Sequence, residues 1–119
     1  GQKTGLIPHL YSEFMRHWTP TELAEYRQVA GDHLQILDVR EPWEYDIAHL
    51  EGSILIPLGT LMQEIDKLDP SKEWLVVCHH GIRSAHACTY LERNGFQVIN
   101  LTGGIDRWAR EIDRDMPLY

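Results

Sequence analysis

Cysteine is scarce in this sequence of 119 residues, where only Cys78 and Cys88 occur. Two thiols are too few for a disulfide scaffold, which argues against a small secreted protein and favours a reducing compartment. Long hydrophobic runs are missing as well, because no stretch approaches the ~20 consecutive apolar residues that span a bilayer. We therefore expect a cytoplasmic protein that does not associate with membranes.

Positive charge is also in short supply, since 11 Lys and Arg residues face 18 Asp and Glu residues for a net charge of −7. General nucleic-acid binding needs a basic face, so no nucleic-acid partner is expected. The content of 43% hydrophobic and 24% charged residues is typical of a globular protein, and the length suits one domain. Against this acidic background one local group of basic side chains stands out: His79, His80, Arg83 and His86.

Apolar residues alternate between strand-like and helix-like patterns from His17 onward. Thr19 and Glu22 have the spacing of a capping box, with Pro20 at the first helical position, which indicates that a helix begins there. The patterns predict strands at 34–39, 54–56, 74–77 and 98–101, and helices at 20–30, 43–48, 61–68, 84–94 and 105–112. Residues 1–16 have no clear period, and we interpret them as an extension or cloning remnant that precedes one domain over residues 17–119.

Two of the predicted strands carry apolar residues at consecutive positions, at 54–56 and 75–77. Such strands are buried on both faces, which is typical of a parallel sheet covered by helices. The alternation of strands with helices favours the same arrangement. The sequence therefore predicts an α/β fold with an open sheet.

The thiol of Cys78 comes directly after one of these buried strands. Ligands of open α/β sheets gather at the carboxyl ends of the strands, and Cys78 is at such an end. The loop from His79 to Ser84 is short, contains Gly81 and leads into a helix, so several of its N–H groups are expected to point inward. Such a loop suits an anion, and a thiolate is an anion.

An ordinary cysteine with a pKa of about 8.5 is only roughly 3% ionised at neutral pH. Making the thiolate the major form takes about 2.7 kcal/mol of preferential stabilisation of the anion. Loop N–H groups, the helix N-terminus and Arg83 are expected to supply it, and the planar fork of Arg83 can also bind an anionic substrate. A buried structural cysteine is the simpler interpretation of a thiol at a strand end. Gly81, Arg83 and Ser84 directly after Cys78 favour the catalytic one.

The loop Cys-His-His-Gly-Ile-Arg-Ser, residues 78–84, resembles the active-site loop of single-domain rhodaneses, the thiosulfate sulfurtransferases. Other segments between about His17 and Pro117 resemble the same family in the same order. These are Leu37-Asp38-Val39-Arg40-Glu41, Glu44-Tyr45, His49 to Ile54 with Ile56-Pro57, and Leu101-Thr102-Gly103-Gly104-Ile105 with Trp108. Glu51 and Ser53 depart from the proline and alanine that are commoner there, and only a local effect is expected.

This resemblance implies an open five-stranded parallel sheet with helices on both faces and a catalytic Cys78 at its carboxyl edge. It implies that the thiolate takes sulfane sulfur from thiosulfate, or a related small anionic donor, as a persulfide. The sulfur would then pass to cyanide, a thiol or a sulfur-acceptor protein. The resemblance also implies which loop residues bind the substrate: His79, His80, Gly81, Ile82, Arg83 and Ser84. No metal and no organic cofactor are expected.

Besides sulfur transfer, a second and a third function are open on the same scaffold. Cysteine phosphatases have a loop one residue longer between the cysteine and the arginine than the loop from Cys78 to Arg83. The shorter loop therefore favours sulfur transfer over a phosphatase or an arsenate reductase. The third alternative is a non-catalytic interaction module, and the presence of both Cys78 and Arg83 argues against it.

The histidines near the loop are a second candidate feature. His79, His80 and His86 match no common zinc spacing with the two cysteines, and the rings of adjacent histidines often diverge, so no metal site is expected. His79 and His80 are instead expected to offer backbone donors, with partly exposed rings that could tune the thiolate.

Three residues outside the loop have predicted supporting roles. Cys88 shares a helical face with Leu91, which indicates packing in the core rather than a resolving thiol. Asp38 and Arg40 flank the end of a strand, where an ion pair would support the active loop from behind without touching the substrate.

Overall fold

Five parallel strands form the sheet at the centre of the molecule. The computed structural model describes residues 15–30 and 34–119, and the strand order within them is β1-β5-β4-β2-β3. The strands are β1 (Arg16–Trp18), β2 (Gln35–Asp38), β3 (Ile54–Leu55), β4 (Glu73–Val77) and β5 (Gln97–Leu101). Every pairing is parallel, so the predicted five-stranded parallel sheet is confirmed.

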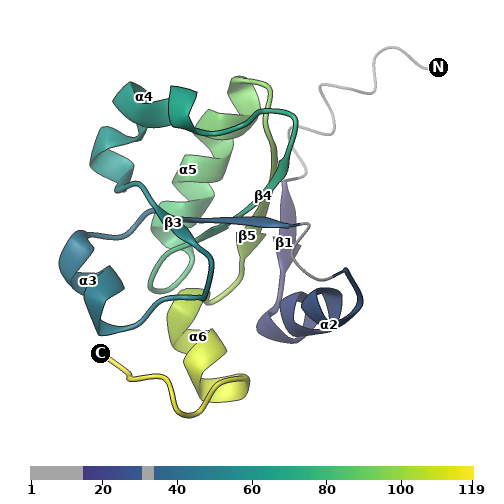
Figure 1. Ribbon diagram of the computed structural model, residues 1–119, viewed down its shortest axis with the longest axis vertical. Coiled ribbons are helices and arrows are strands. Elements are labelled where there is room, and N and C mark those ends of the chain that lie inside the picture. Colours follow the sequence, from purple (N-terminus) through teal and green to yellow (C-terminus); the bar gives the residue numbers. More distant parts are fainter. Residues whose placement is uncertain (1–14, 31–33) are drawn as a thin grey trace.

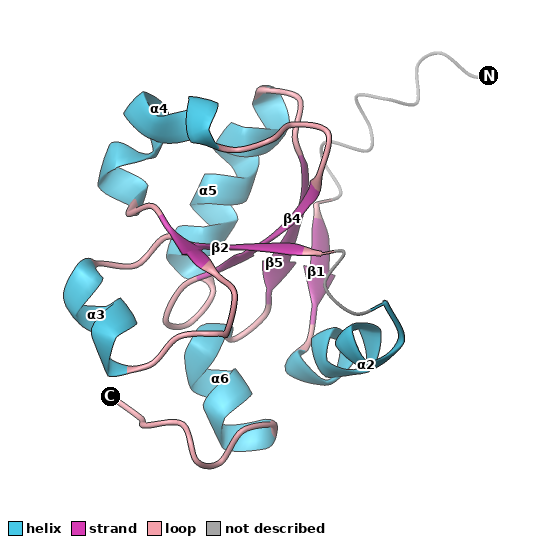
Figure 2. Ribbon diagram, viewed as in Figure 1, coloured by secondary structure: helices cyan, strands magenta, loops and turns pink. Residues whose placement is uncertain are grey.

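Helices cover both faces of this sheet (Figures 1 and 2). They are α2 (Pro20–Ala30), α3 (Pro42–Ile47), α4 (Leu61–Glu64), α5 (Ile82–Arg93) and α6 (Gly104–Glu111), with the 3₁₀ turns η1 (Leu58–Thr60) and η2 (Ile65–Lys67) on either side of α4. In the described ranges, none of these helices has the length and apolar character needed to cross a membrane.

The core divides into two apolar clusters, one on each face of the sheet. Successive residues of a strand point to opposite faces, so Val76 and Cys78 enter the cluster that contains α4 and α5. Leu75 and Val77 enter the other cluster, which contains α2 and α6. The side chain of Cys78 therefore lies on the α5 side of the sheet.

The edge strand β3 corrects one expectation. Ile54 is 42% exposed and Leu55 is partly exposed, whereas burial of the whole 54–56 segment was expected; only Ile56 is buried. β3 pairs with β2 alone because it lies at the end of the strand order, and an edge position leaves its side chains less covered.

Two helix boundaries also differ from the prediction. α5 begins at Ile82 rather than Ser84, because Gly81 takes a left-handed conformation and ends the loop two residues earlier. The predicted helix at 61–68 is a short α-helix between two 3₁₀ turns, although Leu61 and Leu68 are buried as the pattern required.

The strand β1 is the element that the sequence pattern did not predict. It pairs with β5 at the edge of the sheet, and Arg16, expected to belong to an extension, is its first residue. Three residues are too few to show a period of two, and two of them are exposed. Residues 1–14 of the predicted extension lie outside the described residues.

Three loops meet at the carboxyl edge of the sheet because the strands before them are neighbours. β4 lies between β2 and β5, so the loop after β4 is flanked by the loops after those two strands. Two hydrogen bonds fasten α6 to the loop after β4: Ile105 N–H donates to the Cys78 carbonyl at 2.9 Å, and Asp106 N–H donates to the His79 carbonyl at 3.1 Å.

Candidate active site

The sulfur of Cys78 lies where β4 ends, and two backbone amides of the following loop point at it. Gly81 N–H donates to Sγ at 3.0 Å and Ser84 N–H donates to it at 3.3 Å. Cys78 is only 1% exposed. The thiol is therefore almost wholly buried, and polar backbone groups enclose it on its loop side.

Gly81 allows the loop to turn this tightly. Its φ of +101° lies in the left-handed region, where residues with a Cβ are strained. A Cβ at this position would also come 3.2 Å from Gly103 N and 3.4 Å from the Leu101 carbonyl oxygen. A side chain would therefore push the loop away from the end of β5.

A short chain of polar side chains leads from the sulfur into the sheet. The Cys78 thiol donates to Ser84 Oγ at 3.3 Å, and Ser84 Oγ donates to Asn100 Oδ1 at 2.5 Å. Asn100 Nδ2 donates to the Gly81 carbonyl at 3.3 Å and lies 3.3 Å from His17 Nδ1. Since a hydroxyl carries one proton, Ser84 must break its hydrogen bond to Asn100 before it can donate to an ionised sulfur.

The guanidinium of Arg83 is paired with Glu44 on α3. Nη1 and Nη2 donate to the two carboxylate oxygens at 2.7 and 2.9 Å, in the two-pronged geometry that is strong for arginine. The hydrogen bonds from Arg83 lower the pKa of Glu44 to about 2, although burial acts in the opposite direction. The Glu44 carboxylate is thus ionised at neutral pH. It balances the positive charge of Arg83, which was expected from the sequence to face an anionic substrate.

Asp38 and Arg40 form an ion pair in which both side chains are fully buried. Arg40 Nε donates to Asp38 Oδ1 at 2.9 Å, and Arg40 Nη2 donates to Oδ2 at 2.6 Å. Arg40 also donates to the carbonyls of Glu44, in the middle of α3, and of Ala48, just after its last residue, so it fastens the second half of this helix. The predicted support of the loop would act through this helix and Glu44.

Tyr119 joins these two ion pairs. Its hydroxyl accepts from Arg40 Nη1 at 2.8 Å and donates to Glu44 Oε2 at 2.9 Å. Burial raises the pKa of Tyr119 to about 12, so the hydroxyl keeps its proton. The ring stacks on that of His79, with centroids 3.9 Å apart and planes 8° from parallel. Figure 1 shows the C-terminal segment returning beside α3.

His79 and His80 lie together, so the expectation that their rings diverge is wrong. The ring centroids are 3.9 Å apart, and His79 is enclosed between His80 and Tyr119. Burial, and then the neighbouring His80, lowers the pKa of His79 below its ordinary value of 6.5. His80 is more exposed, with its Nε2 3.8 Å from Asp106 Oδ2.

Three other residues in or near the loop, discussed in the sequence analysis, are either exposed or buried. Ile82 is 70% exposed at the rim of the loop, and His86 is exposed on α5. Cys88 is fully buried in the cluster beneath α5, as predicted, and burial raises the pKa of its thiol to about 12. A thiol so difficult to ionise is a poor resolving nucleophile.

Three site residues were not identified from the sequence: Glu44, Asn100 and Tyr119. The spacing of Glu41 and Glu44 contains a local signal, because they form a capping box at the start of α3. That signal indicates where the helix begins. It does not predict that Glu44 pairs with Arg83. Asn100 and Tyr119 have no local signal, since their partners lie in other elements.

This chain is similar to known proteins in both sequence and structure. Residues 19–111 match the family model of the rhodanese-like domain. YtwF of Bacillus subtilis, provisionally named a sulfurtransferase, is 33% identical over 82 residues, which cover 69% of this chain and 80% of that protein. A rhodanese-related protein from Thermoplasma volcanium has a crystal structure that superposes with a TM-score of 0.75, at 33% identity, over 82% of this chain and 93% of that one.

A larger relative contains a similar segment. MoeZ of Mycobacterium tuberculosis, provisionally named an adenylyltransferase/sulfurtransferase, is 36% identical over 104 residues, which cover 85% of this chain. That match covers 26% of MoeZ, so the chain spans about a quarter of the length of this relative.

Proposed function

This chain belongs to the rhodanese-like family of sulfurtransferases, and we propose that it transfers sulfane sulfur from thiosulfate or a related anionic donor through a persulfide on Cys78. The observation that carries the proposal is the pair of amides, Gly81 N–H and Ser84 N–H, directed at Sγ. Hydrogen bonds from backbone N–H groups to a charged acceptor favour the ionised form of that acceptor. The thiolate is the nucleophilic form of cysteine.

In the first half-reaction the Cys78 thiolate attacks the outer sulfur of thiosulfate. A bond forms between the two sulfur atoms while the sulfur–sulfur bond of thiosulfate breaks, and sulfite leaves with its electron pair. In the second half-reaction a thiolate or cyanide attacks the terminal sulfur of the persulfide, and Cys78 leaves as a thiolate. Each half-reaction balances in atoms and electrons, because the leaving group takes the electron pair of the bond that breaks, so no redox partner is needed.

The loop has two parts in this scheme. Gly81 and Ser84 supply amide donors to sulfur, and the Ser84 hydroxyl becomes a third donor when it turns from Asn100. Arg83 keeps guanidinium N–H groups that Glu44 does not use, and these are available to the sulfonate oxygens of a donor. His79, His80 and Ile82 belong to the same loop, and we propose that they contact the donor.

The acceptor is proposed to be a thiol, either small or carried by a protein. This proposal is supported by relatives whose names include sulfur transfer or a sulfur carrier, as for YrkF of Bacillus subtilis, 40% identical over 85 residues. Two free cysteines without a disulfide support a reducing, cytoplasmic setting for the reaction.

Mass spectrometry of the intact protein tests the proposal. The reduced chain mixed with thiosulfate should gain one sulfur atom, and cyanide should remove it as thiocyanate. Cys78→Ser should gain none, whereas Cys88→Ala should gain sulfur as the wild type does. Absence of an adduct on the wild type, or turnover of a phosphate ester at a comparable rate, would overturn the assignment in favour of an interaction module or a phosphatase.

A further inference from the structure

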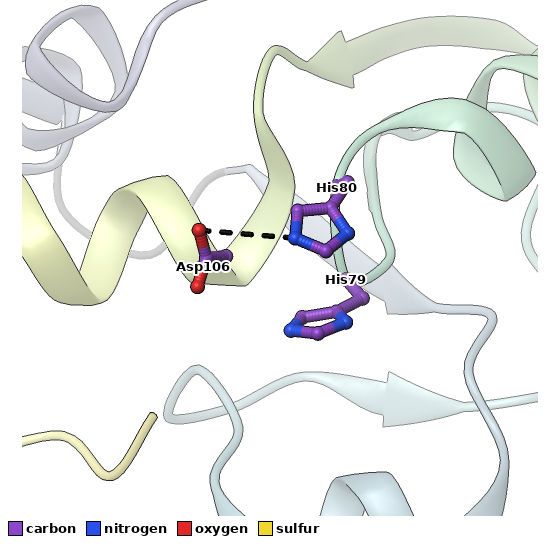
Figure 3. A group of neighbouring side chains, drawn as sticks. All are labelled: His79, His80 and Asp106. Atoms are coloured by element: carbon purple, nitrogen blue, oxygen red, sulfur yellow. Dashed lines mark ion pairs between the residues drawn. The ribbon is translucent and has the colours of Figure 1, made fainter. Parts of the chain in front are cut away.

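Three ligand atoms converge beside the loop, from His79, His80 and Asp106. One atom from each residue lies within 4.8 Å of the other two. Figure 3 shows both rings turning a nitrogen toward the side on which Asp106 lies. We propose that these residues form a binding site for a divalent metal ion of borderline softness, with Zn²⁺ as the best candidate.

One ring nitrogen of His79, Nε2, is buried without a hydrogen-bond partner among the described residues, 15–30 and 34–119. Buried polar atoms in proteins are nearly always paired, because an unpaired one loses its bonds to water without replacement. A metal ion would satisfy this nitrogen, and a neutral imidazole is the form that binds metals.

Contacts within the fold already hold Asp106 and His79 in place. Asp106 lies in the first turn of α6, and its N–H donates to the His79 carbonyl at 3.1 Å. Gly104 lets this turn approach, because a Cβ there would collide with the carbonyl oxygens of Cys78 and His79. The His79 ring is held between Tyr119 and His80, so rotation of the ligand is restricted.

Two imidazoles and one carboxylate are a common ligand set for zinc with an open fourth position. Zinc bonds of about 2.0–2.2 Å place tetrahedral ligand atoms roughly 3.4 Å apart, so ligand atoms that now lie within 4.8 Å of one another would approach by up to about 1.4 Å. The His80 side chain is 59% exposed and free to move. Arg110 Nε donates to Asp106 Oδ2 at 3.0 Å, but Arg110 is 60% exposed and can be displaced.

The nucleophile is not part of this ligand group. Cys78 Sγ accepts from the amides of Gly81 and Ser84, and it is absent from the group of converging ligand atoms. The ion would therefore sit beside the thiol rather than on it. Its charge would attract anions to the entrance of the loop in a chain whose net charge is −7. This inference replaces the expectation that the histidines hold no metal, and it is independent of the proposed sulfur transfer.

Calorimetric titration of the full chain with Zn²⁺, in a buffer that does not bind metal, tests the site. The wild type and Cys78→Ser should each bind one zinc ion with the same affinity. His80→Ala and Asp106→Asn should each weaken binding by at least about tenfold, since even the loss of a residue that supports a ligand costs 10–100-fold. His86→Ala removes an exposed imidazole from α5 outside the group and should change nothing.

Three results would overturn the proposal. One is zinc binding that His80→Ala and Asp106→Asn leave unchanged; another is binding that His86→Ala weakens equally. The third is loss of binding in Cys78→Ser, or a thiolate charge-transfer band after Co²⁺ is added to the wild type, because either places the metal on sulfur. His80 is exposed, so its substitution keeps the test valid if Asp106→Asn destabilises α6.

Discussion

Glu44 and Arg83 are 39 positions apart in the chain, yet they form a two-pronged ion pair with N–O distances of 2.7 and 2.9 Å. The Glu44 side chain is 5% exposed and that of Arg83 is 36% exposed. The pair connects α3 to the first turn of α5, next to the two amides that point at the Cys78 sulfur. The position of the loop therefore depends on a helix from another part of the sequence.

Replacing Glu44 by glutamine should destabilise the fold and slow sulfur transfer. The substitution keeps the shape of the side chain but removes the charge that faces Arg83. We expect the free energy of unfolding to fall by about 1–3 kcal/mol, less than for a fully buried pair because Arg83 is partly exposed. Urea denaturation measures the loss. Glu64→Gln is the matched control, because Glu64 pairs with an exposed Lys67, and it should leave the midpoint unchanged.

The same carboxylate gives the protein a specific acid sensitivity. The pKa of Glu44 is about 2 in the folded protein, against an ordinary value of 4.5. A carboxyl with a lowered pKa stabilises the folded state fully above its ordinary pKa, and that contribution is lost as pH falls toward the lowered value. The difference in unfolding free energy between the wild type and Glu44→Gln should be constant above pH ~5 and shrink between pH ~4.5 and ~2. A difference that persists to the acid end contradicts this assignment.

Gly81→Ala should damage the loop more than a comparable change elsewhere. Gly81 has φ +101°, and a Cβ there would lie 3.2 Å from Gly103 N, whereas Gly52 has φ +83° and a Cβ there would meet nothing within 4 Å. Alanine costs about 1–2 kcal/mol at either site because both are left-handed. Only Gly81→Ala should add a packing cost and reduce sulfur transfer. Unfolding free energies and transfer rates of the two variants, measured together, separate the effects; equal behaviour would mean that the close approach is unimportant.

Ser84→Ala should slow formation of the persulfide by about tenfold to a hundredfold. The change removes the hydroxyl 3.3 Å from the sulfur, and a hydrogen bond to a charged group is worth about 1.5–3 kcal/mol. Stopped-flow measurement of persulfide formation at several thiosulfate concentrations would separate the chemical step from donor binding. Thr89→Ala loses a hydroxyl from an exposed position on the same helix, bonded to the Ala85 carbonyl, and should react at the wild-type rate. A similar rate for Ser84→Ala would exclude a part for this hydroxyl.

Cys88 should make the protein less stable in alkali. Its pKa is about 12 in the fold against an ordinary value of 9.0. The unfolded chain therefore loses this proton first, and stability falls as pH rises above about 9. Near pH 10 the effect amounts to about 1–2 kcal/mol. Urea midpoints from pH ~8 to ~10.5 should decline less steeply in Cys88→Ala than in the wild type. Parallel declines would show that the Cys88 thiol ionises as readily in the folded protein as in the unfolded chain.

Local features of the fold could be predicted because their physical causes are local. The helix α2 begins at Pro20 since Thr19 and Glu22 bond each other's amide groups, at 2.9 and 3.2 Å. The buried strand β4 follows from its consecutive apolar residues, and the turn after it follows from Gly81. The strand β1 could not be predicted, because a partly exposed segment of three residues becomes a strand only when β5 pairs with it.

The sequence by itself determined that a thiol ends a buried strand and meets a short loop entering a helix, because order along the chain and apolar pattern suffice for that. Only the tertiary structure decided which distant side chains reach this loop. Glu44, Asn100 and Tyr119 arrive from α3, β5 and the C-terminal segment, and their contacts depend on how helices pack across the sheet. The pairing of Arg83 and the meeting of His79, His80 and Asp106 have the same origin: the parallel order of the strands brings separate loops to one edge.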